Sequence, residues 1–224
     1  MIIDCISDLH GYYPKLEGGD LLIIGGDLTA GDEPHEYREF TDWLCNYGHG
    51  GDYDQVVIIG GNHDNKISTI LHCWGRLDGV HYLCDARTEF EGLKIWGSPW
   101  TKTFPGMNPH CKAFTVDTDE ELAEKWSLIP HDTDILVTHS PPYDFGDHIK
   151  TEWNDYFAVG SESLYFKVTE ICPKLHVFGH IHEGHGLEKR DYFPRVTTQT
   201  VLYVNASHVN EYYKPVNKPI RVIL

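Results

Sequence analysis

The chain has 224 residues, 41% of them hydrophobic and 23% charged, a composition typical of globular proteins and unlike that of disordered or fibrous chains. It carries 34 acidic and 18 basic residues, so its formal net charge is -16 with neutral histidines. Such a charge repels nucleic acids and anionic lipids at long range, and we therefore do not expect a protein that coats long nucleic acids or binds a membrane surface.

Five short apolar runs predict strands that are buried on both faces. In chain order, they cover residues 2–6, 21–24, 56–59, 135–137 and 175–178. Between them, apolar residues recur every three or four positions over 37–47 and 122–129, which predicts two amphipathic helices, and a third is expected over 161–172. Thr118 and Glu121 have the spacing of a capping box before the second helix.

Residues 89–97, 200–205 and 219–224 have a hairpin-like β pattern, which indicates antiparallel strands beside the parallel ones. Strands that alternate with helices predict an α/β fold with mixed sheets. No repeat, low-complexity tract or linker divides the sequence, so we expect a single domain over residues 1–224.

The cysteines and the first residues indicate the compartment. The six cysteines contain no Cys-x-x-Cys pair, and the first residues lack the basic start and apolar segment of a signal peptide. No window approaches 18 uninterrupted apolar residues. We expect free thiols, a cytoplasmic protein and no membrane-spanning helix.

A polar loop follows each of the five predicted strands, at the end where ligands bind in open α/β sheets. Each loop contains His, Asp or Asn, in most cases beside a glycine that lets the backbone turn sharply. In chain order, these polar residues are Asp8 and His10, then Asp27, then Asn62, His63 and Asp64, then His139, and finally His180 and His182. We expect these side chains to meet at one edge of the fold.

The donor types in these loops favour a metal site, because imidazole, carboxylate and amide oxygen together suit Mn, Fe, Zn, Ni or Co. Seven candidate ligands are too many for one tetrahedral ion but fit two ions bridged by one carboxylate, an arrangement that recurs in displacement at phosphorus. They are Asp8, His10, Asp27, Asn62, His139, His180 and His182. Taken singly, an Asp-x-His or Gly-Asp motif is more often a turn than a ligand set, but their ordered occurrence at five strand ends favours the site.

Five motifs together resemble the signature of the calcineurin-like metallophosphoesterase superfamily. They are Asp8-x-His10, Gly26-Asp27, Gly61-Asn62-His63-Asp64, His139 and Gly179-His180-x-His182. Residues 95–100, 126–130, 174–184 and 204–207 are similar to the metallophosphoesterase-domain (MPPED) branch of that superfamily. Some members of the branch have Gly in place of the first histidine of Gly-His-x-His, whereas this chain has His180, so both metal sites are expected to be complete.

The resemblance implies a metallophosphoesterase-type sandwich of two stacked mixed β-sheets flanked by helices, with metals at the strand ends. It also implies how two divalent ions are held. The first ion is assigned to Asp8, His10, Asp27 and His182, and the second to Asp27, Asn62, His139 and His180, with Asp27 bridging. Manganese is the expected metal, with Fe, Zn, Ni and Co as alternatives.

The expected mechanism is direct hydrolysis, in which a metal-bridging hydroxide attacks phosphorus. His63 follows Asn62 and is the predicted general acid for the leaving alkoxide, with Asp64 holding its ring in the useful tautomer. The alternative role for His63 is that of a structural histidine beside the metals. We expect Asn62, His63 and His185 to contact substrate.

The substrate expectation depends on arginines that this chain lacks. Serine/threonine protein phosphatases of the superfamily place Arg after the Gly-Asp and Asn-His motifs to clamp a terminal phosphate, whereas Leu28-Thr29 and Asn65-Lys66 stand there in this chain. Together with the MPPED resemblance, this favours a phosphodiesterase for small diesters such as cyclic nucleotides. The alternatives are a phosphomonoesterase or nuclease of the same superfamily, or a catalytically quiet protein-interaction module.

Two aromatic-rich segments, 100–114 and 141–157, could shape the rim of the predicted site. Their rings would either stack a nucleobase or pack the two loops onto the core. The expected partner is a small phosphodiester, with no long nucleic acid and no membrane.

Overall fold

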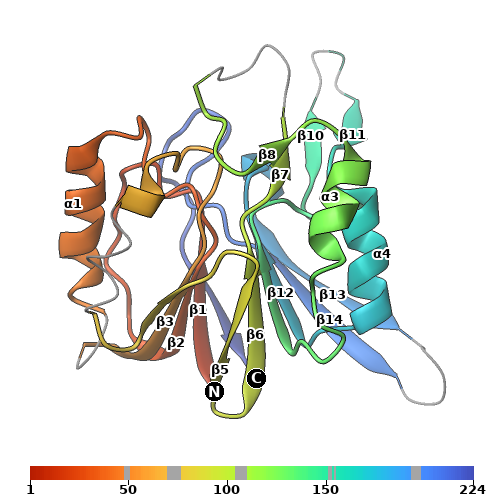
Figure 1. The fold of residues 1–224 in the computed structure, drawn as a ribbon, viewed down its shortest axis with the longest axis horizontal. Helices are drawn as coiled ribbons and strands as arrows, with labels where there is room; N and C mark the ends of the chain where they lie inside the picture. Colours follow the sequence, from red (N-terminus) through yellow and green to blue (C-terminus); the bar gives the residue numbers. More distant parts are fainter. Residues whose placement is uncertain (48–50, 70–76, 104–109, 151–152, 154, 193–197) are drawn as a thin grey trace.

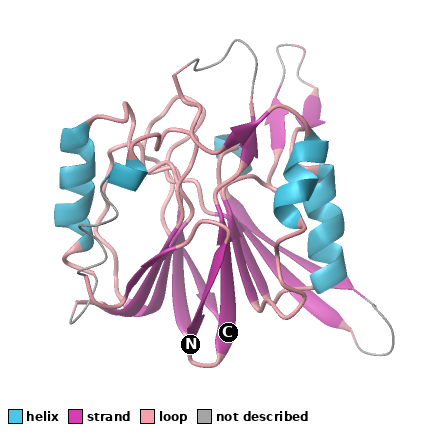
Figure 2. Cartoon of the chain, in the orientation of Figure 1, coloured by secondary structure: helices cyan, strands magenta, loops and turns pink. Residues whose placement is uncertain are grey.

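The computed structural model describes residues 1–47, 51–69, 77–103, 110–150, 153, 155–192 and 198–224. Two large β-sheets stack at the centre of this described part, and helices cover the outer faces (Figures 1 and 2). The arrangement confirms the predicted α/β fold of two mixed sheets flanked by helices.

The first sheet has the order β15-β1-β2-β3-β4 within the described ranges. Its strands are β1 (Ile2–Ile6), β2 (Gly19–Ile24), β3 (Tyr53–Ile58), β4 (Val80–Tyr82) and β15 (Ile220–Ile223). Strands β1 to β4 are parallel to their neighbours, and β15 is antiparallel to β1. The carboxyl ends of β1, β2 and β3 therefore lie at one edge.

The second sheet has the order β13-β14-β12-β9-β6-β5, again for the part of the chain that is described. Its strands are β5 (Ala86–Phe90), β6 (Leu93–Ser98), β9 (Ile135–Thr138), β12 (Leu175–Phe178), β13 (Gly186–Tyr192) and β14 (Gln199–Asn205). The four inner strands are parallel, and the outer strands β5 and β13 are antiparallel to their neighbours. Two short pairs complete the strands, β7 (Thr101–Lys102) with β8 (Thr115–Val116) and β10 (His148–Lys150) with β11 (Tyr156–Ala158).

The side chains of the inner strands alternate between two cores, as the period-2 geometry of strands requires. Between the sheets, the first sheet contributes Ile3, Leu21 and Val57, and the second contributes Ile135 and Val177. On the outer face of the first sheet, the alternate residues pack against α1 (Pro34–Leu44). Helices α3 (Asp119–Trp126) and α4 (Glu162–Ile171) cover the outer face of the second sheet. Figure 1 shows α1 and the α3–α4 pair on opposite sides of the molecule.

Local signals fix where the helices begin. Thr118 and Glu121 form the predicted capping box, in which Glu121 N donates to Thr118 Oγ1 at 3.2 Å and Thr118 N donates to Glu121 Oε2 at 3.1 Å. Ser161 accepts from Leu164 N at the start of α4. Two short 3-10 helices, η1 (Ile67–Thr69) and η2 (His182–Gly184), lie in the loops after β3 and β12.

The three hairpin-like segments are all strands, but they pair in different ways. The predicted hairpin over 89–97 is present as β5 and β6. The tail segments 200–205 and 219–224 are also strands, but they do not pair with each other. Strand β14 forms a hairpin with the preceding strand β13 in the second sheet, whereas β15 pairs with β1, at the other end of the sequence, in the first sheet. The residues between them therefore cross from one sheet to the other.

Candidate metal centre

The carboxyl ends of β1, β2, β3, β9 and β12 carry the loops that hold the predicted ligands, as expected for parallel strands in stacked sheets. Asp27 is central among these side chains. Its Oδ2 atom lies 3.6 Å from His10 Nε2, 3.5 Å from His139 Nε2 and 4.0 Å from His63 Nε2. Its Oδ1 atom accepts a hydrogen bond from the backbone of His63 at 2.9 Å. Three loops thus converge on one carboxylate.

Asp8 lies at the centre of a second set of contacts. Its Oδ1 atom is 3.4 Å from His182 Nε2. The backbone N–H of His180 donates to both carboxylate oxygens, at 3.0 and 3.1 Å, and Ser207 Oγ donates to Oδ2 at 2.8 Å. Asp8 therefore connects the loops after β1 and β12 with the segment that follows β14.

The backbone is strained at four of the seven predicted ligands. Asp8, His10, Asp27 and His180 have φ values of 51°, 43°, 52° and 69°, in the left-handed region that residues other than glycine rarely adopt. Each such residue costs about 1–3 kcal/mol, and strain of this kind persists where the surrounding structure imposes it, most often at functional sites. The sharp turns aim the four side chains toward the same space beyond the strand ends.

Glycines allow the loops to approach these carboxylates. A Cβ atom at Gly61 would collide with Asp27, and one at Gly179 would collide with Asp8 and Ser7. Because any side chain at these two positions would displace a predicted ligand, the Gly-Asn-His-Asp and Gly-His-x-His motifs require glycine for steric reasons.

The second ring nitrogen of two histidines is bound to a backbone carbonyl. His139 Nδ1 lies 2.9 Å from Gly25 O, and His182 Nδ1 lies 3.1 Å from Asn210 O. Such a contact fixes the tautomer and the direction of the ring, which leaves Nε2 as the lone-pair donor. In both residues Nε2 is the atom that faces a carboxylate.

The electrostatics of the cluster favour cations. Burial lowers the pKa of His10 to about 4, and burial with the charge of His139 lowers that of His180 to about 3, so both rings are neutral imidazoles. Burial also lowers the pKa of His139, but Asp27 and Asp8 outweigh it and raise the value to about 9. Burial raises the pKa of Asp27, yet the charges of His139 and His63 hold it well below its usual range. Two buried carboxylates, two neutral imidazoles and a histidine whose proton the carboxylates stabilise form a site that divalent cations would occupy in place of protons.

The donor geometry fits metal ions. Three groups of side chains bring their donor atoms within 4.8 Å of one another among the described residues: Asp8, His10 and His182; His10, Asp27 and His63; and Asp8, Asp27 and His139. Neither ring nitrogen of the buried His10 has a hydrogen-bond partner in the described chain. A buried polar group without a partner costs about 1–3 kcal/mol, which coordination to a cation would remove. The nitrogen and oxygen donors suit divalent transition metals.

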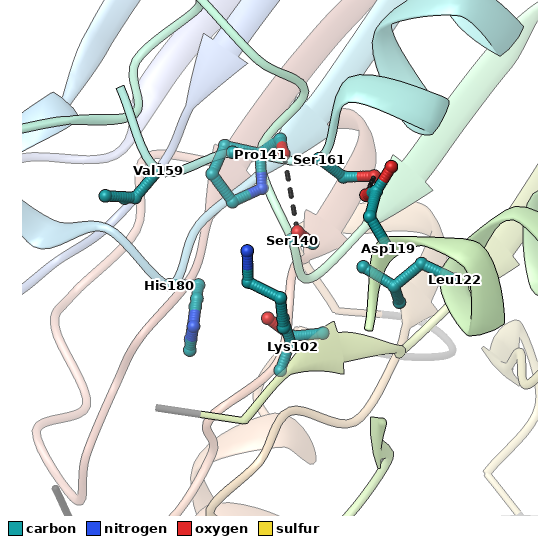
Figure 3. A pocket seen from close by; sticks show the side chains of 10 residues that line it. Lys102, Asp119, Leu122, Ser140, Pro141, Val159, Ser161 and His180 are labelled. Atoms are coloured by element: carbon teal, nitrogen blue, oxygen red, sulfur yellow. Dashed lines mark hydrogen bonds between the residues drawn. The ribbon is translucent and has the colours of Figure 1, made fainter. Parts of the chain in front are cut away.

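His180 lies beside His139 but in none of those three groups, and the amide of Asn62 also lies beside His139. Asn62 Oδ1 is 3.1 Å from His139 Nε2, and the ring centroids of His139 and His180 are 5.0 Å apart. His180 also lines a pocket next to the cluster, together with Thr101, Lys102, Ser140 and Gly160 among others. Figure 3 shows the amino group of Lys102 directed into this pocket beside the His180 ring.

The surroundings of His63 and Asp64 differ from the expected ones. His63 Nδ1 lies 3.0 Å from Ala30 O, so this carbonyl orients the ring in the way expected of Asp64. Asp64 instead accepts hydrogen bonds from the backbone of Gly61, Leu28 and Thr29, at 2.8 to 3.3 Å. Its carboxylate therefore ties the loop after β3 to the loop after β2. The carboxylate is turned away because these buried N–H groups have no other acceptor in the described chain.

His185 lies beside the segment that follows β14. It is half-buried, and burial lowers its pKa; its neighbours are the main chain of Ser207 and the ring of His208. In the described parts of the two aromatic segments, some rings pack onto the core and others face solvent. Phe145 stacks on Tyr203 with ring centroids 3.9 Å apart, whereas Trp153 is 85% exposed. Residues 104–109, 151–152 and 154 of these loops lie outside the described residues.

Sequence reasoning missed three residues that contact the cluster: Ser207, Asn210 and Tyr213. The ring of Tyr213 lies 4.9 Å from that of His10 and 5.1 Å from that of His182, measured between centroids. Ser207 belongs to the segment 204–207 that resembles the MPPED branch, so a signal for it was present. Asn210 contacts His182 through its backbone carbonyl, and Tyr213 lies in no motif, so no sequence pattern pointed to either residue.

Comparisons with known proteins agree with this geometry. A sequence model of the calcineurin-like phosphoesterase family matches residues 1–184. The chain belongs to this family. Metallophosphoesterase domain-containing protein 1 of Homo sapiens is 32% identical over 98% of this chain and 70% of its own length. UPF0046 protein C25E10.12 of Caenorhabditis elegans is 29% identical over 96% of this chain and 78% of its own length.

Solved structures show the same fold at low sequence identity. The crystal structure of TT1561 of Thermus thermophilus superposes with a TM-score of 0.53 at 16% identity, covering 92% of this chain and 90% of that one. A further solved structure, 12% identical, reaches a TM-score of 0.63 over 91% and 89% of the two chains. Family membership and the clustered His and Asp side chains make the protein a metal-dependent phosphoesterase.

No helix of the described chain combines the length and the apolar character needed to cross a membrane. The cysteines at positions 5, 45, 84, 111 and 172 are free thiols, and Cys73 lies outside the described residues.

Proposed function

We propose that this phosphoesterase is a dinuclear phosphodiesterase that hydrolyses small phosphodiesters, such as cyclic nucleotides. The observation that carries the proposal is the carboxylate of Asp27, which has three histidine Nε2 atoms from three different loops within 4.0 Å. A single carboxylate in this position can bridge two ions. Manganese is the metal we expect first, because nitrogen and oxygen donors without thiolate suit it; Fe, Zn, Ni and Co are the alternatives.

The family pattern supports the following assignment of ligands, and the clustered donors of Asp8, His10 and His182 support it for one ion. Asp8, His10, Asp27 and His182 would hold one ion, and Asp27, Asn62, His139 and His180 the other. When bound, a pair of divalent cations supplies positive charge to the phosphoryl oxygens and acidifies the attacking water. The chain itself positions the donors, through strained turns and through carbonyls on His139 and His182.

His63 is the proposed general acid for the leaving alkoxide. Its Nδ1 contacts Ala30 O, so Nε2 points toward Asp27 and the cluster. A histidine held in this way can deliver a proton from Nε2 to an alkoxide within hydrogen-bond reach. Asn62, beside His139, is the proposed contact to the phosphoryl group, and His185 is the proposed contact at the rim.

The lack of arginine directly after the Gly-Asp and Asn-His motifs supports a diester. Lys66, which stands where a clamp would be, is engaged with Asp32: its Nζ donates to Asp32 O at 2.8 Å and lies 3.6 Å from Asp32 Oδ2. No described contact joins a guanidinium to the cluster: Arg87 pairs with Glu89, and Arg221 with Asp4. A diester has one anionic oxygen fewer than a monoester and needs the clamp less.

The test uses metal-stripped protein supplied in turn with Mn, Fe, Zn, Ni, Co and Mg. Hydrolysis of bis-p-nitrophenyl phosphate and p-nitrophenyl phosphate is followed in parallel, with Asn62→Ala as the matched variant. We expect metal-dependent turnover of the diester that the variant loses. Fast cleavage of the monoester with no cleavage of the diester or of cyclic nucleotides would refute the proposal.

A phosphomonoesterase is the second candidate, and Lys102 favours it. Its amino group points into the pocket beside His180 (Figure 3), where it can meet an additional negative charge on the substrate. The monoester arm of the same experiment distinguishes the two activities, and Lys102→Met should then reduce monoester turnover more than diester turnover.

We also propose that the reaction takes place in the cytoplasm on small substrates, without long nucleic acids or membranes as partners. Free thiols are compatible with a reducing compartment, and the net charge of -16 opposes the binding of polyanions.

A further inference from the structure

Residues 206–217, which we call the crossing segment, pass from the second sheet to the first along the edge that carries the predicted ligands. The segment leaves β14 and joins the loop after β1: Ser7 N donates to Ala206 O at 2.8 Å, and His208 N donates to Ser7 O at 2.7 Å. It lies beyond residues 1–184, which the family model matches. Apart from Ser207, which lies in the motif at 204–207, its contacts with the cluster come from residues outside the motifs identified in the sequence.

The crossing segment contacts every member of one ligand group. Ser207 Oγ donates to Asp8 Oδ2 at 2.8 Å, and Asn210 O lies 3.1 Å from His182 Nδ1. The ring of Tyr213 meets those of His10 and His182 edge-to-face, with interplanar angles of 75° and 89°. Asp8, His10 and His182 are the three side chains of the first group of clustered donors. One segment of chain thus contacts a carboxylate and two imidazoles.

The other predicted ligands are held by other parts of the protein. His139 Nδ1 contacts Gly25 O, in the loop after β2, and its Nε2 contacts Asn62, in the loop after β3. The crossing segment should therefore influence one ion more than the other.

The turn that presents Tyr213 is strained and tightly bonded. Tyr213 has a φ of 56°, in the left-handed region. Its N–H donates to Asn210 O at 2.8 Å, and Asn210 Oδ1 accepts from the N–H groups of Tyr212 and Lys214 at 3.1 and 3.0 Å. The ring of Tyr213 contacts the cluster and is 39% exposed, whereas the neighbouring Tyr212 is 71% exposed. These hydrogen bonds hold Tyr213 in an unfavourable backbone conformation, which directs its ring onto the rings of His10 and His182.

We propose that the crossing segment sets the affinity of the Asp8–His10–His182 group for its ion, with Ser207 and Tyr213 as positioning residues. This inference rests on the dinuclear centre of the proposed function. Outer contacts of this kind orient ligands before the metal arrives, and their loss typically weakens metal binding 10- to 100-fold. Ser207 fixes the Asp8 carboxylate, and Tyr213 limits the rotation of both imidazoles.

The test measures Mn²⁺ binding by isothermal titration calorimetry, independently of turnover. In the wild type we expect two ions; in Ser207→Ala and Tyr213→Ala, one of them should bind about 10- to 100-fold more weakly, with the other unchanged. Two variant backgrounds show which of the two ions Tyr213→Ala weakens. In Asn62→Ala, which weakens the second ion, Tyr213→Ala should still weaken the remaining one. In His182→Ala, which weakens the first ion, Tyr213→Ala should leave the affinity for the remaining second ion unchanged.

Three more variants separate positioning from stability. Tyr213→Phe keeps the ring and should bind Mn²⁺ as the wild type does, and Tyr212→Ala should also leave binding unchanged. Tyr213→Gly and Tyr213→Ala both lack the ring, but only glycine relieves the left-handed backbone, so the metal-free Gly variant should unfold at a higher temperature than the Ala variant. Equal weakening of Mn²⁺ binding in both supports positioning.

Three results would overturn the inference. The Mn²⁺ affinity of the variants could fall in proportion to their unfolding temperature, both ions could be weakened equally, or the wild type could bind no Mn²⁺. A protein that binds two Mn²⁺ ions in the expected pattern but hydrolyses no diester would refute the proposed phosphodiesterase and leave the role of the crossing segment standing.

Discussion

The side chains of His63 and Asp64 leave the loop after β3 in different directions. The His63 ring turns toward Asp27 and is held from behind by Ala30 O, whereas the Asp64 carboxylate turns back onto the backbone of Gly61, Leu28 and Thr29. The two residues lie in a tight turn, in which Asp64 N donates to Gly61 O at 3.1 Å, and one side chain faces the site while the other faces the scaffold. The two substitutions should therefore affect different properties.

Substitution of His63 should depend on the leaving group. If His63 protonates the leaving oxygen, His63→Gln should slow hydrolysis of a cyclic nucleotide, whose leaving group is a basic alkoxide, by about 10²- to 10⁴-fold. Bis-p-nitrophenyl phosphate releases a weakly basic phenolate that needs no proton, so its turnover should fall much less. Steady-state kinetics with both substrates, at equal metal content, check this; equal losses would show that His63 does not act as the acid.

Substitution of Asp64 should reduce stability. Asp64→Ala leaves the buried N–H groups of Gly61, Leu28 and Thr29 without their acceptor, and we expect the free energy of unfolding to fall by roughly 3 kcal/mol, since each buried donor without a partner costs about 1–3 kcal/mol. Asp64→Asn keeps one carbonyl acceptor and should lose less. Urea unfolding of the metal-free variants provides the measurement, and unchanged stability of the alanine variant would contradict the role assigned to the carboxylate.

At the scale of elements, the sequence predicts the strands and helices that are long and have a clear apolar pattern. The central strands are continuous apolar runs in the sequence because both of their faces are buried. The capping box of α3 is recognisable from the spacing of Thr118 and Glu121. Strands of two or three residues, such as β7 and β10, have too few positions to show a period. Strand β13 is almost entirely exposed, with the sequence Gly-Leu-Glu-Lys-Arg-Asp-Tyr, so only its pairing with β14 makes it a strand.

The same limit applies to the site. The predicted ligands were recognisable because they follow apolar runs directly. The direction of the Asp64 carboxylate, the carbonyl behind His63 and the position of Tyr213 depend on loops that meet only after folding. Sequence spacing carries no information about such contacts between segments that are about 30 to 200 residues apart.

Strand β12 carries a buried titratable group that predicts a pH dependence of stability. His176 is fully buried beside Thr138, with Nε2 2.8 Å from Thr138 Oγ1, and burial lowers its pKa to about 3. In the unfolded chain the value returns to about 6.5, so between pH 6.5 and 3 the unfolded state binds the proton and the folded state does not. This contribution is complete above pH 6.5 and is lost as the pH falls.

We expect His176 to account for about 1.5 kcal/mol of the stability lost between pH 6.5 and pH 5, from the linkage of this single group. His176→Leu removes the titration and should flatten the pH dependence by that amount, whatever its effect at neutral pH. Unfolding free energies of both proteins at several pH values test this. Identical slopes for the two proteins would mean that His176 does not titrate as burial requires.

At the scale of the whole molecule, the candidate metal centre is a connection between the two sheets. Asp8 and Asp27 come from the first sheet and His139, His180 and His182 from the second. Ions bound between them would link the two sheets at one edge, in addition to the apolar contacts that join their faces.

Metal removal should therefore lower the stability of the entire protein. At a free concentration 100-fold above the dissociation constant, each ion adds about 2.7 kcal/mol to the free energy of unfolding. For a chain of this size, that corresponds to several degrees in the unfolding temperature. Thermal scans with and without a chelator measure the effect, which restored Mn²⁺ should reverse. An unfolding temperature indifferent to the chelator would argue against ions at this edge.

The two ends of the chain meet at the opposite edge of the first sheet (Figure 1). The amino group of Met1 donates to Leu224 O at 2.8 Å, and Arg221 binds Asp4 through two hydrogen bonds of 2.8 Å. The strands run from this edge toward the predicted ligands, so either terminus could be fused to another protein or attached to a solid support with the catalytic edge left open to solution. Joining the ends by a short linker and opening the chain at an exposed loop would give a permuted enzyme with the same centre.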